Sequence, residues 1–253
     1  MVSNINRELE AEGRTVVATA ADRSSPLRLL GGIAVRLTCP SAARAPFDRV
    51  CGDLDFASGG KAAAVEAAFA AAGWSPEPEF NLYNGGERLI FRKGELKADV
   101  FLGDFRMCHR IPLAGRLTAD PLSLPLAELL LTKLQVVEAN GKDLGDTACI
   151  LLDHAPGDGD GQSINREAFL RPCSRDWGLW RTAGLSLAKV LDWSRENVAD
   201  ASELALIAGR VAELSALLEA ADKSLAWKAR SVAGDRLRWY ELPEEVGGVG
   251  PEK

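Results

Sequence analysis

Alternation between apolar and polar residues predicts a small sheet in the first half of the chain. The runs from Arg88 to Arg92 and from Leu96 to Leu102 both alternate, and Lys93-Gly94-Glu95 between them is typical of a hairpin turn. The segment from Asp53 to Ala57 has the same period of two and predicts a further strand. Another short strand is expected between Cys108 and Leu113.

Helical periodicity predicts helices around these strands. Residues 1–24 are expected to form a helix or a frayed lead-in, and residues 27–39 a short apolar segment with a helix from about Gly32. An Ala-rich helix should run from Lys61 to Ala72, with Ser58 as its cap and Gly73 just after its end. Pro76 to Glu87 is expected to be mostly loop.

The second half of the chain is predicted to be mainly helical. Residues 125–139 and 143–154 each form an amphipathic pattern, as do residues 176–195 and 201–221. One face of the last of these carries an apolar stripe formed by Leu204, Ile207, Val211, Leu214 and Leu218.

These elements predict an α/β (α+β) fold with a small mixed, twisted sheet flanked by helices and a helical C-terminal region. We expect a core over residues 1–155, a helical region over 156–243 and a disordered tail over 244–253. Between core and helical region, Ala155 to Gly161 has the composition of a flexible linker.

Composition narrows the class of protein. Of the 253 residues, 47% are hydrophobic and 26% charged, which is typical of a soluble globular protein. A net charge of −6 argues against a surface that coats nucleic acid generally, although not against a local basic groove. Residues 1–13 lack the apolar region of a signal peptide, and no apolar run approaches the ~20 residues of a membrane span. We therefore expect a cytoplasmic protein without a membrane partner.

The five cysteines and two histidines do not form a metal-binding pattern. The cysteine count is odd, the spacing is wide and no C-x-x-C occurs. We interpret the cysteines as reduced thiols rather than as a disulfide framework or a zinc site.

The candidate chemistry lies in three carboxylates. Asp53 and Asp55 alternate with apolar residues, so a strand would direct both carboxylates to one face. Asp99 lies in the second strand of the predicted hairpin. Carboxylates that converge on one point are costly unless a divalent cation neutralises them, and oxygen ligands suit Mg²⁺.

Upstream of the carboxylates, Gly31-Gly32 separates an apolar run from a helical one. Taken alone, the pair is best explained as a tight turn. With Asp53 and Asp55 downstream, a phosphate-binding role is favoured, because glycine lets the backbone come close and a helix N-terminus favours anions. A second phosphate-binding candidate, Ser58-Gly59-Gly60-Lys61, is not a P-loop, since that pattern needs glycine where Asp55 stands.

This ordered set resembles the nucleotidyltransferase superfamily, whose members have a Gly-Gly or Gly-Ser pair opening a helix, an acidic-x-acidic strand and a third acidic residue on a later strand. Downstream, Lys133 in Leu-Leu-Leu-Thr-Lys-Leu-Gln and the run Gly141-Lys142-Asp143-Leu144-Gly145-Asp146 are similar to the Lys and Lys-Asp-x-x-Asp motifs of the AbiEii-like branch. That branch includes toxins of type IV toxin–antitoxin systems. The resemblance covers roughly residues 25–155.

The resemblance implies transfer of a nucleoside monophosphate from an NTP to an acceptor, with two Mg²⁺ ions. Asp53 and Asp55 would hold both metals, and Asp99 would hold one and accept the proton of the attacking hydroxyl. The implied acceptor is RNA, with tRNA ends among the candidates, and the implied protein partner is a cognate antitoxin.

For nucleotide binding, the resemblance implies that Gly31, Gly32 and Arg36 approach the triphosphate and that Lys133 contacts its β- and γ-phosphates. Asp143 and Asp146 would orient Lys133 or the base. Three of these residues also have simpler explanations. Arg36 could be a solvated surface residue, Lys133 a snorkelling side chain and Asp143 a helix cap. Gly32 stands where many relatives have Ser or Thr, which removes a hydroxyl contact to phosphate.

Other functions remain open at this point. The acceptor could be a small hydroxyl compound, such as an aminoglycoside, or a protein side chain, and the acidic pI of 5.2 slightly favours these. A non-catalytic nucleotide-binding module is a further alternative.

Two groups of cations are candidates for holding an acceptor. Cations interleaved with aromatic side chains can hold phosphates and stack bases. A solvated helix face with aromatic residues packed in the core is the simpler interpretation. The first group is Arg106, His109, Arg110 and Arg116; the second is Lys223, Lys228, Arg230, Arg236 and Arg238, with Trp227, Trp239 and Tyr240 among them.

Overall fold

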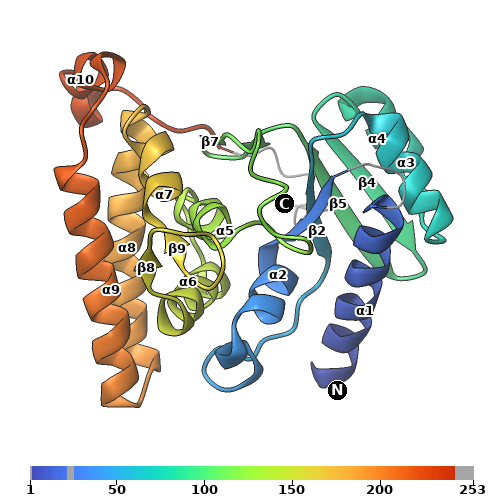
Figure 1. Cartoon of the computed structure of the whole chain (residues 1–253), viewed down its shortest axis with the longest axis horizontal. Coiled ribbons are helices and arrows are strands. Elements are labelled where there is room, and N and C mark those ends of the chain that lie inside the picture. The colour runs from blue at the N-terminus through green and yellow to red at the C-terminus, as the bar shows by residue number, and fades with distance from the viewer. Residues whose placement is uncertain (1, 22–25, 243–253) are drawn as a thin grey trace, which may run out of the picture.

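A five-stranded mixed sheet forms one half of the protein, and a bundle of helices forms the other (Figure 1). The computed structural model describes residues 2–21 and 26–242. The tail predicted over 244–253 and the end of the predicted lead-in lie outside the described residues. None of the helices in the described part is long and apolar enough to cross a membrane.

The sheet has the order β1-β2-β5-β4-β3, in which β2 and β5 are parallel and the other neighbours antiparallel. Its strands are β1 (Leu27–Leu30), β2 (Leu54–Ser58), β3 (Ser75–Pro76), β4 (Arg88–Lys93) and β5 (Leu96–Leu102). The hairpin predicted from the alternating pattern is confirmed as β4 and β5. A second small hairpin pairs β6 (Phe105–Arg106) with β7 (Arg110–Ile111), which accounts for the strand expected after Cys108.

Three helices lie beside the sheet, namely α1 (Val2–Ala21), α3 (Ala62–Ala71) and α4 (Pro78–Asn84) (Figure 1). Helix α1 packs against α3 and β1. An aromatic cluster lies between α3 and the sheet, where Phe69 stacks on Phe91 with ring centroids 4.0 Å apart and meets Phe56 edge-on. These three buried phenylalanine rings form part of the hydrophobic core of this half.

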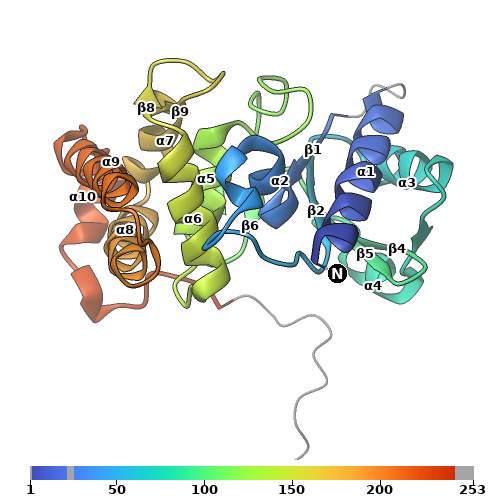
Figure 2. The same cartoon turned by 90° about the horizontal axis from the view of Figure 1, so that it is seen from below.

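The helical half begins with α5, which follows the sheet in the chain. Its helices are α5 (Leu126–Leu134), α6 (Gly141–Asp153), α7 (Arg166–Cys173), α8 (Trp177–Asn197), α9 (Ala201–Ala220) and α10 (Leu225–Ser231). Helices α6, α8 and α9 pack on one another, and α2 (Gly31–Thr38) lies between this bundle and the sheet (Figure 2). On α9 the predicted apolar stripe is confirmed, because Ile207, Val211, Leu214 and Leu218 are buried and Leu204 packs against the core.

The mixed α/β class with a following helical region is thus confirmed, while several boundaries differ. Residues 78–84, expected as loop, form α4, because Pro78 stands at the first helical turn, where proline's fixed φ is favourable. Ser58 does not cap α3: its Oγ accepts from the Gly60 amide at 3.0 Å, and Lys61 takes the cap position. Gly73 ends the helix at φ +81°, as predicted.

Two other segments are shorter or more ordered than predicted. Helix α5 ends at Leu134 rather than near residue 139. Within the predicted linker, β8 (Pro156–Gly157) pairs in parallel with β9 (Ile164–Asn165), so its first residues are hydrogen-bonded to the chain that follows. The division into domains at residue 155 stays a prediction.

Candidate active site

Strands β2 and β5 bring the three predicted carboxylates together. Asp55 and Asp99 are directly opposite each other in the parallel register, and Asp53 precedes Asp55 by two residues. One carboxylate oxygen from each of the three lies within 4.8 Å of the others, a spacing that could hold a metal ion. All the donors are carboxylate oxygens, which suit Mg²⁺ rather than a thiophilic metal.

Two cations that the sequence analysis missed hold Asp99. Arg88 on β4 donates to its Oδ1 from Nε at 3.0 Å and from Nη2 at 2.7 Å. The ammonium of Lys97 lies 2.8 Å from Oδ2. The period of two could have identified both cations. Lys97 precedes Asp99 by two residues on β5, and Arg88 precedes by two the residue of β4 that is opposite Asp99, Ile90. These ion pairs partly offset the mutual repulsion of the carboxylates.

The protonation of Asp55 reflects this crowding. Burial, followed by the negative charges of Asp53 and Asp99, raises the pKa of Asp55 to about 7. A carboxyl group that holds its proton near neutral pH needs additional positive charge to ionise fully. A divalent cation held by the three carboxylates would supply that charge.

This raised pKa predicts how the stability of the metal-free protein depends on pH. Asp55 ionises near 3.8 when the chain is unfolded and near 7 when it is folded, so the folded state binds more protons between these values. Its contribution to stability therefore falls as pH rises from about 4 to 7 and stays low above 7. We expect Asp55→Asn to remove this dependence. At pH 8 in EDTA, its free energy of unfolding should exceed that of wild type by about 2 to 4 kcal/mol.

Thermal unfolding of both proteins across pH 4–8 measures the difference. The gap between Asp55→Asn and wild type should widen toward pH 7 in EDTA and narrow when Mg²⁺ is added. A constant gap at every pH would contradict the raised pKa of Asp55.

Gly31 brings the start of α2 against the carboxylates. Its φ of +69° lies in the left-handed region, and a Cβ built on it would lie only 2.2 Å from Oδ2 of Asp55. Both the backbone conformation and the close approach therefore require glycine. The first amides of α2 have no side-chain cap, and a helix N-terminus favours an anion.

Lys133 of α5 lines the same cleft as Gly31 and the three carboxylates. Its ammonium is 2.8 Å from Oδ2 of Asp146 and 3.1 Å from Oδ1 of Asp143, both on α6. Burial works to lower the pKa of Lys133, but the two carboxylates outweigh it and the pKa is raised. Asp143 is not the cap of α6, since Asn140 occupies that position and its Oδ1 accepts from the Lys142 and Asp143 amides.

Asp146 has a second partner that the sequence analysis did not single out. The guanidinium of Arg49 donates to both of its oxygens, from Nε at 2.9 Å and from Nη2 at 2.7 Å. Burial acts to raise the pKa of Asp146, but Lys133 and Arg49 lower it overall. Asp146 therefore stays ionised between two cations, although only 5% of it is exposed. No periodic pattern marks Arg49, because it lies in the loop before β2.

Most of these groups face one cleft of about 1090 Å³ between the sheet and α5. Its other ionisable side chains include both acids and bases, and four aromatic rings border it. Arg88 lies over the Phe101 ring at 5.0 Å. Besides Gly31, the ionisable and aromatic residues that line it are Asp53, Asp55, Phe80, Tyr83, Glu87, Arg88, Lys97, Asp99, Phe101, Asp104, Phe105, Arg106, Lys133, Glu138, Asp143 and Glu241.

Arg36 is not brought to this cleft. Its guanidinium is bound by Glu10 at 3.1 Å and Asp48 at 2.8 Å, and it also donates to the Ala42 carbonyl. These contacts tie α2 to α1 and to the following loop. Arg36 therefore holds α2 in place and does not line the cleft.

The first predicted group of cations does not act as one surface. His109 is buried: its amide donates to Gln135 and its Nε2 lies 2.8 Å from Oγ1 of Thr182, while burial lowers its pKa. Arg110 is paired with Asp104, and Arg116 with Glu128 and Asp160. Arg106 alone of the four lines the cleft, and it has no ion pair within the described part of the chain.

The second predicted group is largely used in packing. Lys223 donates to the Leu218 and Ala221 carbonyls at the end of α9, and Arg230 stacks over Trp177 at 4.6 Å. Arg238 lies over the Tyr240 ring at 5.1 Å. Lys228 and Arg236 are exposed. The simpler interpretation of packed aromatics with a solvated face fits most of this group.

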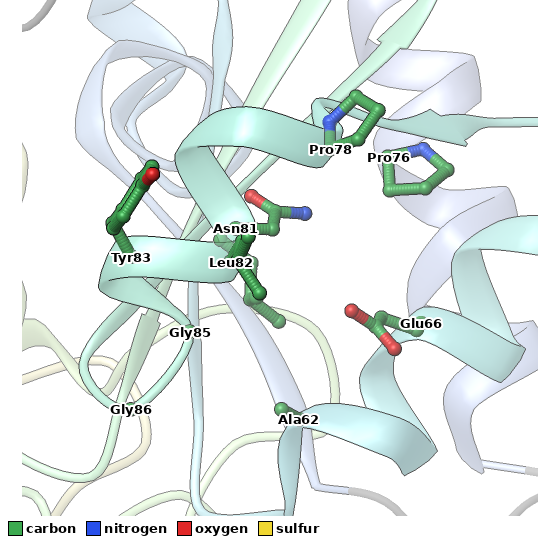
Figure 3. A pocket seen from close by; sticks show the side chains of 10 residues that line it. Ala62, Glu66, Pro76, Pro78, Asn81, Leu82, Tyr83, Gly85 and Gly86 are labelled. Carbon is green, nitrogen blue, oxygen red and sulfur yellow. The ribbon is translucent and has the colours of Figure 1, made fainter.

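A second, smaller hollow of about 500 Å³ lies between α3 and α4 (Figure 3). Glu66 of α3 faces it, together with Leu82 and Asn81 of α4. Asn81 already exchanges hydrogen bonds with the backbone of Ile90. Glu66 is the single charged residue in its lining, so this hollow lacks a group of residues suited to catalysis.

No family model and no curated protein sequence matches this chain. A solved structure that resembles it is a tRNA nucleotidyltransferase complexed with a primer tRNA and an incoming ATP analog. The two are 15% identical, with a TM-score of 0.30 over 78% of this chain. The match spans about half of that protein, 50% of its length. A likeness this remote identifies neither a family nor an activity for this chain.

Proposed function

We propose that this protein is a Mg²⁺-dependent nucleotidyltransferase that moves a nucleoside monophosphate from an NTP to an acceptor hydroxyl. The observation that carries the proposal is the convergence of Asp53, Asp55 and Asp99 in one cleft with Gly31 and Lys133. The oxygen donors and the raised pKa of Asp55 both fit a divalent cation. Mg²⁺ bound there would draw negative charge from the transferred phosphate and the leaving group.

The residues of the cleft suit the separate tasks of this reaction. The amides at the start of α2, beside Gly31, bind phosphate oxygens, and the ammonium of Lys133 stabilises charge on the departing pyrophosphate. Asp99, which is paired with Arg88 and Lys97, accepts the proton of the attacking hydroxyl. The new bond joins the acceptor oxygen to the α-phosphorus, and the bond from that phosphorus to pyrophosphate breaks.

RNA is the acceptor that we propose. Arg106 is exposed in the cleft, and the rings of Phe80 and Tyr83 border the same space. Tyr83 is 83% exposed, so a base can stack on it without displacing packed side chains. Cations beside exposed aromatic rings are what a single-stranded RNA end requires.

A small cationic acceptor, such as an aminoglycoside, is a second candidate. It is favoured by Glu87, Glu138 and Glu241, which line the cleft and have no ion pair with any described residue. Unpaired carboxylates attract amines and repel a phosphate backbone.

Replacement of Arg106 separates these acceptors. If RNA is the acceptor, Arg106→Ala should raise the KM for RNA. It should also reduce the slope of log K for RNA binding against log salt concentration by about one. Arg110→Ala is the matched control, because that neighbouring guanidinium is paired with Asp104 and does not line the cleft. Equal effects of the two substitutions, or a higher activity of Arg106→Ala on an aminoglycoside, would count against an RNA acceptor.

We further propose that the protein belongs to the AbiEii-like branch and acts as a toxin with a cognate antitoxin. Lys133, Asp143 and Asp146 support the branch, because they match its motifs in order and meet around one ammonium group. Growth of cells that express the protein with and without a functional Asp55 tests the toxin role.

A further inference from the structure

Arg49 occupies the space beside Gly32. A Cβ built on Gly32 would lie 2.3 Å from Nη2 of Arg49 and 3.0 Å from Sγ of Cys51. Any side chain at position 32 must therefore displace the guanidinium. Gly32 and Arg49 therefore form one structural feature, since the guanidinium takes the space that a side chain at position 32 would need.

The same guanidinium is fixed by a buried carboxylate. Both oxygens of Asp146 accept from Arg49, and Oδ2 of Asp146 also lies 2.8 Å from the ammonium of Lys133. A two-point contact between planar groups fixes orientation as well as distance. Helix α2 packs against α5 and α6. Because Arg49 lies against Gly32 and binds Asp146, it joins the start of α2 to the helices that carry Lys133 and Asp146.

We propose that Arg49 is a positioning residue for the triphosphate site, which it builds by locking Asp146 against Lys133 and by filling the space next to Gly32. The inference rests on the proposed function, because it concerns the same nucleotide. Arg49 does not line the cleft, so it acts through Lys133 and through the start of α2 rather than by touching substrate. Lysine replaces it only in part, since a single ammonium lacks the two-point geometry.

Kinetic parameters of Arg49 variants test this role. We expect Arg49→Ala to lower kcat/KM for the NTP by up to about 100-fold, mostly through KM, because misplacing a binding group by about 1 Å costs this much. Arg49→Lys should recover only part of the loss, and added guanidinium ion should restore activity to Arg49→Ala. The matched control is Arg36→Lys, since Arg36 also binds two carboxylates near α2 but lies outside the cleft.

A double-mutant cycle with Gly32 tests the shared space. Gly32→Ala should give a loss similar to that of Arg49→Ala, because its methyl group displaces the guanidinium. The double variant should be no worse than Arg49→Ala alone, since both changes break one contact. Additive losses, or a loss in Arg36→Lys as large as in Arg49→Lys, would overturn the inference.

Binding of a non-hydrolysable NTP analogue with Mg²⁺ distinguishes this inference from the proposed function. Suppose wild type transfers no nucleotide, but the analogue binds and Arg49→Ala weakens its binding in a way that guanidinium restores. The positioning role then stands and the transferase fails. If instead wild type transfers nucleotide and Arg49→Ala leaves both binding and kcat/KM unchanged, the positioning role fails while the transferase stands.

Discussion

Asp55→Ala is expected to abolish nucleotide incorporation while leaving the protein folded. Asp55 is the central carboxylate of the trio, since it is opposite Asp99 in the sheet and two residues from Asp53. Loss of a metal ligand removes several kcal/mol of transition-state stabilisation, and about 1.4 kcal/mol is worth a factor of ten. The expected loss is therefore about a thousandfold or more. Incorporation of labelled nucleotide measures it.

The fold should survive this substitution because the raised pKa of Asp55 shows that its charge is unfavourable in the metal-free protein. Asp104→Asn is the control, as Asp104 lines the same cleft but binds Arg110. In growing cells, wild type should slow growth and Asp55→Ala should relieve it if the protein is a toxin. Retained incorporation by Asp55→Ala would eliminate the assigned metal site.

Lys133→Met has the second largest expected effect, on binding and on stability. The substitution leaves Asp143 without its ion pair and Asp146 with Arg49 as its remaining cation. Breaking a buried ion pair by removing one partner costs about 3 kcal/mol or more. We also expect the KM for the NTP to rise by at least about tenfold, because a charge-assisted contact to phosphate is lost.

Denaturant unfolding and analogue binding below the melting temperature separate these two effects. Lys61→Met is the control, since Lys61 precedes α3 and lies outside the cleft. Wild-type affinity for the analogue in a folded Lys133→Met variant would show that Lys133 has only a structural role.

The carboxylate trio could be predicted from sequence because a period of two fixes which residues share a face of a strand. Asp53 and Asp55 follow from it directly. That Asp99 joins them depends on the parallel pairing of β2 with β5, which no local pattern specifies. The resemblance to nucleotidyltransferases implied that Asp99 joins Asp53 and Asp55, but it did not predict the pairing of these strands.

Residues in loops or held by distant partners could not be placed from sequence. Arg49 reaches Asp146 across 97 positions, and Arg36, which was expected at the phosphate, is bound by Glu10 from α1. His109 is buried against Thr182, 73 positions away. In each case a long-range partner decides the role of a charged or polar side chain.

The most direct test of the central claim is to follow the two ends of the triphosphate separately. Purified protein is incubated with Mg²⁺, total RNA and an NTP labelled at either the α- or the γ-phosphate. Transfer of a nucleoside monophosphate predicts that the α-label becomes attached to RNA and that the γ-label is released in pyrophosphate. Attachment of the γ-label to any acceptor, or release of inorganic phosphate without attachment of the α-label, would contradict nucleotidyl transfer.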